Sequence, residues 1–446
     1  MLIKFRVENF LSFYNKREFS MIAGKSRLHS SHVYENKTNN KFSLMKTSYI
    51  YGANASGKTN FIKSVNYARE CVLKGISRMN TLEKTYKLDA SSIKKPTQFE
   101  FEILIGDKVY AYGFSILLLT KEVLEEWLVE VGEDKDINLL NRKKNEVECS
   151  LDLTEKDKNR LNVYIEDLKS NYLLLEVLKE KQWDKKDYEF LKILKWLEQD
   201  LIIIFPNTSN YLMEYFDNKN CWLNYFEKFG IEIKSIDLGE REFEELPIPR
   251  EIKDKISNDI ANLISKDVEQ KTRTVIDLGN NFLNLYVKDN KLKAKEILFS
   301  HKSLQGEVKF KFYEESDGTK RLLELLPLLE RVKKENHTIL IDELERSLHP
   351  LLSQEILKSF YKNMEETKSQ LIITTHESRL LNLKYIRRDE VWFAENSLKE
   401  GTKLYSLEEF KTRFDQKLDK AYLIGRYGGI PNIKSLLNDT ERDCDE

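Results

Sequence analysis

The chain has 446 residues, of which 41% are hydrophobic and 33% are charged. That length exceeds the size at which a single hydrophobic core stops growing, so two or more structural units are expected. The 73 Lys and Arg residues almost cancel the 74 Asp and Glu residues, which excludes a globally basic nucleic-acid binder but leaves a local basic stripe open.

The cysteines, the histidines and the first residues indicate a protein of a reducing compartment. The 4 cysteines lie far apart without a CxxC pair, and the 6 histidines are scattered without metal-ligand spacing. Residues 2–7 alternate as a strand does and do not resemble a charged-then-apolar signal sequence. No apolar run approaches the ~18 residues that a membrane span needs. We therefore expect a cytoplasmic protein without a membrane segment.

The N-terminal elements are predicted to be strands around one helix. Strands are expected at 2–7 and 17–23, and a third strand at 45–51 leads into a turn that contains glycine. Helical spacing follows that turn and ends at Gly75, after which residues 98–131 return to strand character. We assign residues 1–135 to the N-terminal part of an α/β domain.

The turn at 52–59, Gly-Ala-Asn-Ala-Ser-Gly-Lys-Thr, matches the pattern G-x-x-x-x-G-K-[ST] of a phosphate-binding loop. Small residues let backbone N–H groups curl around a β-phosphate. Lys58 would place its charge on the β- and γ-phosphates, and Thr59 would offer a hydroxyl to Mg²⁺ at the positive end of the following helix. The expected nucleotide-binding residues here are Gly52, Asn54, Ser56, Gly57, Lys58 and Thr59.

The middle of the chain is predicted to be a mainly helical insertion, residues 136–270. Between 151 and 229 the chain is rich in Lys and Glu, lacks glycine and places apolar residues at helical spacing, apart from one strand-like run at 201–205. Further elements expected here and beyond are a helix at 249–265 and strands near 272–288 and 296–313.

Helix and strand alternate over the last part of the chain, residues 271–446, which argues for a parallel α/β sheet. The elements expected are a helix at 318–334, a strand at 338–341, a helix at 350–364, and strands at 371–375 and 390–394.

The strand at 338–341 ends in two adjacent acids, Asp342 and Glu343. A carboxylate at the C-terminal edge of a strand is where an α/β sheet presents ligand-binding groups. Asp342 would hold Mg²⁺, directly or through water, and Glu343 would orient and deprotonate the attacking water. Two acids after an apolar run are common, so this interpretation depends on their pairing with the loop at 52–59.

Three more positions lie where a helix begins or a strand ends. Ser316 and Gly318 stand at the start of the helix at 318–334, where a helix N-terminus can receive a γ-phosphate, although an ordinary serine cap gives the same pattern. His376 ends the strand at 371–375, where its imidazole could donate to a γ-phosphate or to the attacking water. Taken alone, it could equally be a structural histidine.

Together the segments GANASGKT, ESDGTK, ILIDELERSLHP and TTHES resemble the ABC/SMC-related ATPases of the AAA-15/AAA-21 (OLD/RecF-like) group. The resemblance is closest to stand-alone ATPases of bacterial anti-phage and abortive-infection systems, and residues 3–13 resemble the first strand and turn of that group. It implies an α/β fold, the ABC-type P-loop ATPase head with a mixed β-sheet and flanking helices, carrying a mainly helical insertion. ATP and Mg²⁺ are the implied cofactors.

The resemblance also implies roles for individual residues. Glu343 is similar in position to the catalytic base and His376 to the switch histidine. Ser316 and Gly318 would act on ATP held by a second copy of the chain, so that a homodimer or higher homo-oligomer forms around the nucleotide. Gln98 is a candidate for the glutamine that senses the metal.

We therefore expect an ATPase that senses or regulates in anti-phage defence and controls a separate effector, a toxin or a nuclease. Family members fused to a nuclease carry it at the C-terminus, and residues 377–446 are too few for such a domain. A RecF/SMC-like DNA-repair or recombination ATPase that clamps DNA is the alternative, whereas a pure scaffold would need neither Glu343 nor His376. The candidate DNA-binding clusters, which solvated loops would also explain, are Arg142, Lys143 and Lys144, and Lys291, Lys293 and Lys295.

Overall fold

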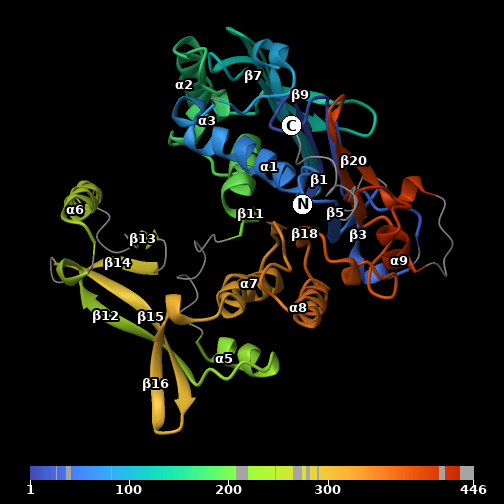
Figure 1. Cartoon of the computed structure of the whole chain (residues 1–446). Helices are drawn as coiled ribbons and strands as arrows, with labels where there is room; N and C mark the ends of the chain where they lie inside the picture. Colours follow the sequence, from blue (N-terminus) through green and yellow to red (C-terminus); the bar gives the residue numbers. More distant parts are fainter. Residues whose placement is uncertain are drawn as a thin grey trace, which may run out of the picture. The chain divides into compact units, whose positions relative to one another are not determined.

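The computed structural model describes residues 1–26, 28–36, 42–81, 83–206, 219–246, 248–264, 274–277, 282–288, 291–410 and 417–431 (Figure 1). The chain divides into two compact units. The first comprises Met1–Phe205, Val332–Leu344 and Phe360–Glu446, and the second comprises Pro206–Arg331 and Glu345–Ser359.

A six-stranded sheet in the first unit has the order β11-β17-β18-β5-β19-β20. Its neighbours pair in parallel, except β19 with β20. β11, β17, β18 and β5 are buried along their whole length, as expected of parallel strands covered on both faces. This confirms the predicted parallel α/β sheet. The strands are β5 (Thr47–Tyr51), β11 (Leu201–Ile204), β17 (Thr338–Ile341), β18 (Gln370–Thr375), β19 (Val391–Ser397) and β20 (Gly401–Ser406).

A seven-stranded antiparallel sheet in the same unit has the order β10-β9-β8-β7-β6-β1-β2. Buried residues alternate along β1 and β6, which places one apolar face against helix α1 (Lys58–Lys74). Phe5 illustrates this packing, because its ring centroid lies 5.9 Å from that of Phe61 and 4.9 Å from that of Phe101. The strands are β1 (Leu2–Glu8), β2 (Arg17–Ser20), β6 (Thr97–Ile105), β7 (Lys108–Leu117), β8 (Glu122–Val131), β9 (Ile137–Lys143) and β10 (Glu146–Cys149).

Helices connect and cover these sheets in the first unit. Helix α1 ends at Lys74 before Gly75, whose φ of 91° suits glycine, as the sequence predicted. The other helices of this unit are α2 (Glu155–Glu166), α3 (Leu174–Lys179), α4 (Glu189–Lys195), the π-helical turn η4 (Trp196–Asp200) and α9 (Leu418–Leu423). Shorter elements are β3 (Val33–Glu35), β4 (Ser43–Met45), η1 (Ser30–His32), η2 (Ile76–Arg78), η3 (Ala90–Lys94), η8 (Ser378–Leu380) and η9 (Leu407–Glu409).

The second unit combines helices with a five-stranded antiparallel sheet, in which β12-β15-β14-β13 follow one another and β16 pairs with β15 (Figure 1). Its strands are β12 (Ser235–Glu242), β13 (Thr274–Asp277), β14 (Phe282–Lys288), β15 (Lys291–Ser303) and β16 (Gly306–Lys311). Its helices are α5 (Lys219–Lys228), η6 (Phe243–Glu245), α6 (Arg250–Ile264) and η7 (Phe312–Glu314), and two helices cross the unit boundary in sequence, α7 (Asp317–Lys334) and α8 (Pro350–Asn363).

The compact units divide the chain at other positions than 135 and 270. Residues 136–205 belong to the first unit, because the hairpin of β9 and β10 extends its antiparallel sheet. Residues 271–331 belong to the second unit, because β14 and β15 pair with each other and β15 pairs with β12. The sequence did not indicate β12, since half of its residues are charged and mask the strand pattern.

The structure removes Arg142 from the first basic cluster, in which Lys143 and Lys144 are exposed, and places the second cluster on a strand. Arg142 is only 1% exposed, and its guanidinium donates to the main-chain oxygens of Lys144, Lys169 and Tyr172 at 2.7, 3.3 and 2.5 Å. It therefore belongs neither to a basic stripe nor to a solvated loop. The lysines at 291, 293 and 295 lie on strand β15, where Lys293 is 3.0 Å from Glu242. Facing acids on β12 thus offset much of this positive charge.

Among the helices that the structure describes, none has both the length and the apolar composition that a bilayer crossing requires.

Candidate functional site

The turn at 52–59 links β5 to α1 and curls tightly. Ala55 and Gly57 adopt positive φ angles of 63° and 105°, and the helix begins at Lys58. This conformation directs main-chain N–H groups and the positive end of α1 toward the space that the turn encloses. The expected phosphate loop is therefore a strand, a turn and a helix in the predicted order.

Lys58 lies over this turn. Its ammonium group donates to the main-chain oxygens of Gly52 at 2.7 Å and of Ala53 at 3.0 Å, and the residue is only 7% exposed. A buried cation that rests on main-chain carbonyls of the loop can transfer those hydrogen bonds to an anion bound in the loop.

Two glycines of the loop are required by close neighbours. A Cβ atom at Gly52 would lie 2.4 Å from Ser56 Oγ, and one at Gly57 would lie 2.1 Å from Thr402 Oγ1. The Thr402 hydroxyl also donates to Ser56 O at 3.1 Å, and it lies 2.8 Å from the hydroxyl of Ser12. Thr402 therefore contacts the loop at Ser56 and Gly57, and Ser12 contacts Thr402. Sequence reasoning assigned no role to either residue, although Ser12 lies in the segment 3–13 that resembles the ATPase group.

Two other loop residues differ in burial. Ser56 is buried, and its hydroxyl has no hydrogen-bond partner among the residues that the structure describes. Asn54 is exposed at the tip of the loop. A buried hydroxyl without a protein partner is suited to a bound ligand or water.

Asp342 follows β17 and faces the start of α1. Its Oδ1 accepts hydrogen bonds from Thr59 Oγ1 at 3.2 Å and from Thr374 Oγ1 at 2.6 Å, and the residue is 1% exposed. Burial raises the pKa of this carboxyl, although the two threonine hydroxyls oppose that shift. A nearby cation would stabilise the ionised form.

Glu343 is held in an uncommon conformation next to Asp342. Its φ is 49°, in the left-handed region, and its N–H donates to Thr374 Oγ1 at 2.9 Å. Thr374 therefore bonds both to the carboxylate of Asp342 and to the main chain of Glu343, so one hydroxyl on β18 orders both acids. The sequence placed Thr374 in the strand at 371–375 and in the segment TTHES, but assigned it no role.

Strand order explains why distant segments meet. β17, β18 and β5 are adjacent and parallel, with Ile341 opposite Ile373 and Thr375 opposite Tyr51. The residues that follow these strands, Asp342, His376 and Gly52, therefore lie along one carboxyl edge of the sheet, as expected of an α/β ligand site. His376 is exposed there.

Ser316 and Gly318 belong to the second unit. Ser316 Oγ accepts the N–H of Thr319 at 3.1 Å, which makes it the cap of α7, and it contacts Thr319 Oγ1 at 2.8 Å. Ser316 and Asp317 are exposed, whereas a Cβ at Gly318 would lie 3.0 Å from Ser347 O. Both the predicted helix start and the ordinary serine cap are thus present.

Gln98, the candidate metal sensor, lies on β6 of the antiparallel sheet, opposite Glu8 and Ser115. Asp342 lies at the end of β17 in the other sheet. The strand end next to Asp342 is that of β11 and not that of β6, which carries Gln98. The N–H of Asp342 donates to Ile204 O, at the end of β11, at 2.9 Å.

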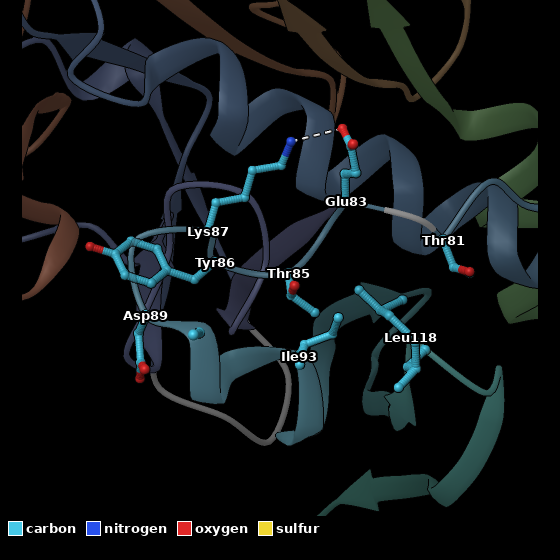
Figure 2. A pocket seen from close by; sticks show the side chains of 10 residues that line it. Thr81, Glu83, Thr85, Tyr86, Lys87, Asp89, Ile93 and Leu118 are labelled. Atoms are coloured by element: carbon cyan, nitrogen blue, oxygen red, sulfur yellow. Dashed lines mark hydrogen bonds and ion pairs between the residues drawn. The ribbon is translucent and has the colours of Figure 1, made fainter.

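One cavity opens beside the loop. It has a volume of about 210 Å³ and is lined by Ser12, Asn60 and Asn396 among others, and Asn60 directly follows Thr59. A larger cavity, about 610 Å³, shares the lining residues Glu83 and Lys87 with it, and these two form an ion pair (Figure 2).

The donor set fits a nucleotide with a magnesium ion. Mg²⁺ takes oxygen ligands and is usually bound by one or two carboxylates or hydroxyls plus substrate phosphates, which matches Asp342 and Thr59. Among the described residues, no group of three or more His, Cys, Asp or Glu side chains could hold a metal ion. The loop would bind the phosphates and Asp342 the metal.

A family model described as "AAA domain, putative AbiEii toxin, Type IV TA system" (AAA_21) matches residues 48–382. No curated protein matches the chain. Among solved structures, the chain is similar to an Smc head bound to the C-winged helix domain of ScpA, with 12% identity, a TM-score of 0.40, and coverage of 92% of this chain and 99% of that one.

Two further SMC heads are similar to the same extent. The head domain from Thermotoga maritima has 10% identity and a TM-score of 0.36, with coverage of 91% of this chain and 98% of that one. The head with an extended coiled coil from Pyrococcus furiosus has 12% identity and a TM-score of 0.38, with coverage of 92% and 97%.

The family match covers the loop, the start of α7, both acids and His376 in one span. The predicted fold class, a P-loop ATPase head of the ABC type with a mixed α/β architecture, is confirmed. The chain therefore belongs to the AAA_21 family of ATPase domains.

Proposed function

We propose that this chain binds Mg-ATP at the loop of residues 52–59 and hydrolyses it between two copies of itself. The observation that carries the proposal is the Asp342 carboxylate, which accepts from Thr59 at the start of the helix that follows the loop. Loop, helix start and carboxylate are the three parts that phosphate and magnesium require.

The chemistry assigned to each residue follows from its position. Lys58 and the loop N–H groups would bind the β- and γ-phosphates, and bound Mg²⁺ would neutralise charge that develops on the transferred group. Glu343 would accept a proton from the attacking water. His376, exposed at the same strand edge, would donate to the γ-phosphate or to that water.

The second copy enters the proposal through α7. Ser316 and Gly318 mark a capped and exposed helix start, and Asp317 beside them adds negative charge. Such a start would receive a γ-phosphate only where another surface supplies the cations. The loop and the metal of a second copy would supply them, so the site would be complete only in the dimer.

Mixing two inactive variants tests this arrangement. Lys58→Ala removes phosphate binding, and Gly318→Arg blocks the helix start, so each protein alone should lose at least about 90% of its phosphate release. A mixed dimer keeps one intact site, made of Lys58 from one copy and Gly318 from the other. Mixing equal amounts should therefore restore about a quarter of the parent rate if the sites act independently.

The matched control is Lys74→Ala in place of Lys58→Ala. Lys74 is exposed at the far end of the same helix. This protein should hydrolyse ATP at the parent rate, and mixing it with Gly318→Arg should only dilute that rate. Full activity of Gly318→Arg alone would contradict the shared site.

We further propose that the ATPase regulates a separate effector, a toxin or a nuclease, in defence against phage. The description of its family names a toxin and a toxin–antitoxin system, which supports this direction. Copurification with the product of the adjacent gene, and phage plating with the parent and the Glu343→Gln chain, would test it. Equal plating for both, with no copurifying protein, would contradict the role.

A further inference from the structure

The C-terminal segment of residues 418–430 folds back onto the six-stranded sheet. It comprises α9 and a turn in which Gly425, Gly428 and Gly429 have φ angles of 79°, 69° and 65°. Tyr422 and Tyr427 are buried at 4% and 1% exposure, although Leu423 and Ile424 between them are exposed. This segment is therefore docked by its two tyrosines.

Tyr422 is placed against the first residues of the phosphate loop. Its ring meets Tyr51 edge-on, with centroids 5.6 Å apart, and stacks on Phe393 at 5.7 Å. Its hydroxyl donates to Gly429 O at 3.1 Å. The docked turn is also close to the loop, since a Cβ at Gly429 would lie 3.6 Å from Gly52 Cα.

We propose that Tyr422 is a positioning residue for the phosphate loop, so that ATP affinity depends on docking of the C-terminal segment. This inference rests on the proposed function of the loop. Gly52 is buried and begins the turn, and the hydroxyl of Tyr422 donates to Gly429, the residue that lies next to Gly52. Burial raises the pKa of Tyr422 to about 12, so the hydroxyl keeps the proton that it donates to Gly429.

The physical consequence follows from leaving a buried acceptor, the Gly429 carbonyl, without its donor. Without the Tyr422 hydroxyl, the turn at Gly429 would shift relative to Gly52, and the fraction of molecules with a binding-competent loop would fall. Affinity for ATP falls in proportion to that fraction. Once ATP is bound the loop is in place, so the chemical step should change little.

Linkage makes the effect reciprocal. If docking of residues 418–430 strengthens ATP binding, ATP must strengthen docking by the same factor. ATP binding would therefore reach the C-terminal segment through Tyr422.

Tyr422→Phe is the direct test, and Tyr427→Phe is its matched control. Tyr427 stacks on the same Phe393, and its hydroxyl has no hydrogen-bond partner among the described residues. Titration with a fluorescent ATP analogue should show binding about 5–30-fold weaker for Tyr422→Phe, with Tyr427→Phe within about twofold of the parent. KM for ATP should rise similarly, with kcat within about threefold.

The outcomes separate this inference from the proposed function. A parent protein that does not bind the analogue would refute the function itself. A parent that binds, with both variants equal in affinity, would refute only the role of Tyr422.

Hydrogen exchange of the unmodified protein gives a second measurement that does not depend on a folded variant. ATP should slow exchange in peptides that cover 417–431 together with those that cover the loop. Protection of the loop alone, with unchanged exchange at 417–431, would overturn the proposal.

Discussion

Two helices of this chain begin beside a serine and a glycine, yet their surroundings differ. At the start of α1, Ser56 and Lys58 are buried at 4% and 7% exposure, and Thr402 packs beneath Gly57. At the start of α7, Ser316 is exposed and only caps its own helix. The first start lies beside a buried cation, Lys58, and the buried carboxylate of Asp342, whereas the second carries the exposed Asp317.

This difference teaches what a helix N-terminus can do alone. Its partial positive charge contributes typically ~0.3–1 kcal/mol to binding an anion at an exposed site. The start of α1 adds Lys58 and the loop amides to that charge, whereas the start of α7 adds the exposed carboxylate of Asp317. The second start would therefore contribute to binding a phosphate only when another surface carries the rest of the charge.

The largest effect is expected when the chemical step alone is removed. Glu343→Gln keeps the size of the side chain and removes the base, so ATP turnover should fall about 10²–10⁴-fold while ATP affinity changes little. If α7 completes the site only around bound ATP, the trapped nucleotide should also hold two copies together. Phosphate release and light scattering with ATP present would measure both.

Glu366→Gln serves as the control for that experiment, because Glu366 is exposed elsewhere in the first unit. It should behave as the parent does. Turnover of the Glu343→Gln protein within about threefold of the parent would refute the assignment of the base.

A pair of glycine substitutions contrasts the two helix starts directly. Gly57→Ala places a Cβ against Thr402 at a positive φ, so it should lower the free energy of unfolding by about 2–3 kcal/mol and weaken ATP binding. Gly318→Ala lies in a helix, where alanine gains up to ~1 kcal/mol against a tight approach to Ser347. Thermal melts and ATP titrations should show damage to stability and binding only for Gly57→Ala. Equal melting temperatures would contradict this contrast.

The smallest effect concerns the buried carboxylate of Asp342, which lowers the free energy of unfolding while no ligand is bound. Burial raises the pKa of Asp342, so its ionised form disfavours folding once pH exceeds the ordinary aspartate value of about 4. Asp342→Asn should then stabilise the nucleotide-free protein by roughly 0.5–2 kcal/mol near neutral pH. Melting curves across pH should show this gain vanish in acid, where both forms are uncharged.

With magnesium and ATP present, the parent should be more stable than the Asp342→Asn protein. They should raise the melting temperature of the parent but not of the Asp342→Asn protein, since only the parent holds the metal. If the nucleotide-free Asp342→Asn protein is less stable than the parent, the buried carboxylate does not lower the free energy of unfolding, and this prediction is wrong.

Local sequence patterns predicted those parts of the molecule that depend on neighbouring residues. The loop at 52–59 was identified from the pattern of its own residues. The strand at 338–341 was predicted with the bounds that the structure shows. The parallel sheet followed from alternating helices and strands. These features need no knowledge of distant contacts.

Other parts depend on contacts between distant segments and could not be read from the sequence. Thr374 orders both acids only because β18 lies beside β17, and Thr402 supports Gly57 only because β20 ends the sheet near the loop. Arg142 resembled a surface cation, yet main-chain carbonyls surround it. Strand pairing and burial of this kind are set by the fold as a whole.

The two units are joined by more than one connection. The chain passes between them at 205/206, 331/332, 344/345 and 359/360. The third passage follows Leu344, the second residue after Asp342. The second unit therefore cannot be removed as one continuous stretch, since deletion of 206–331 would leave 345–359 without the rest of that unit. The peptide that carries Asp342 and Glu343 leads directly into the second unit, so these two acids lie at a covalent junction of the two units.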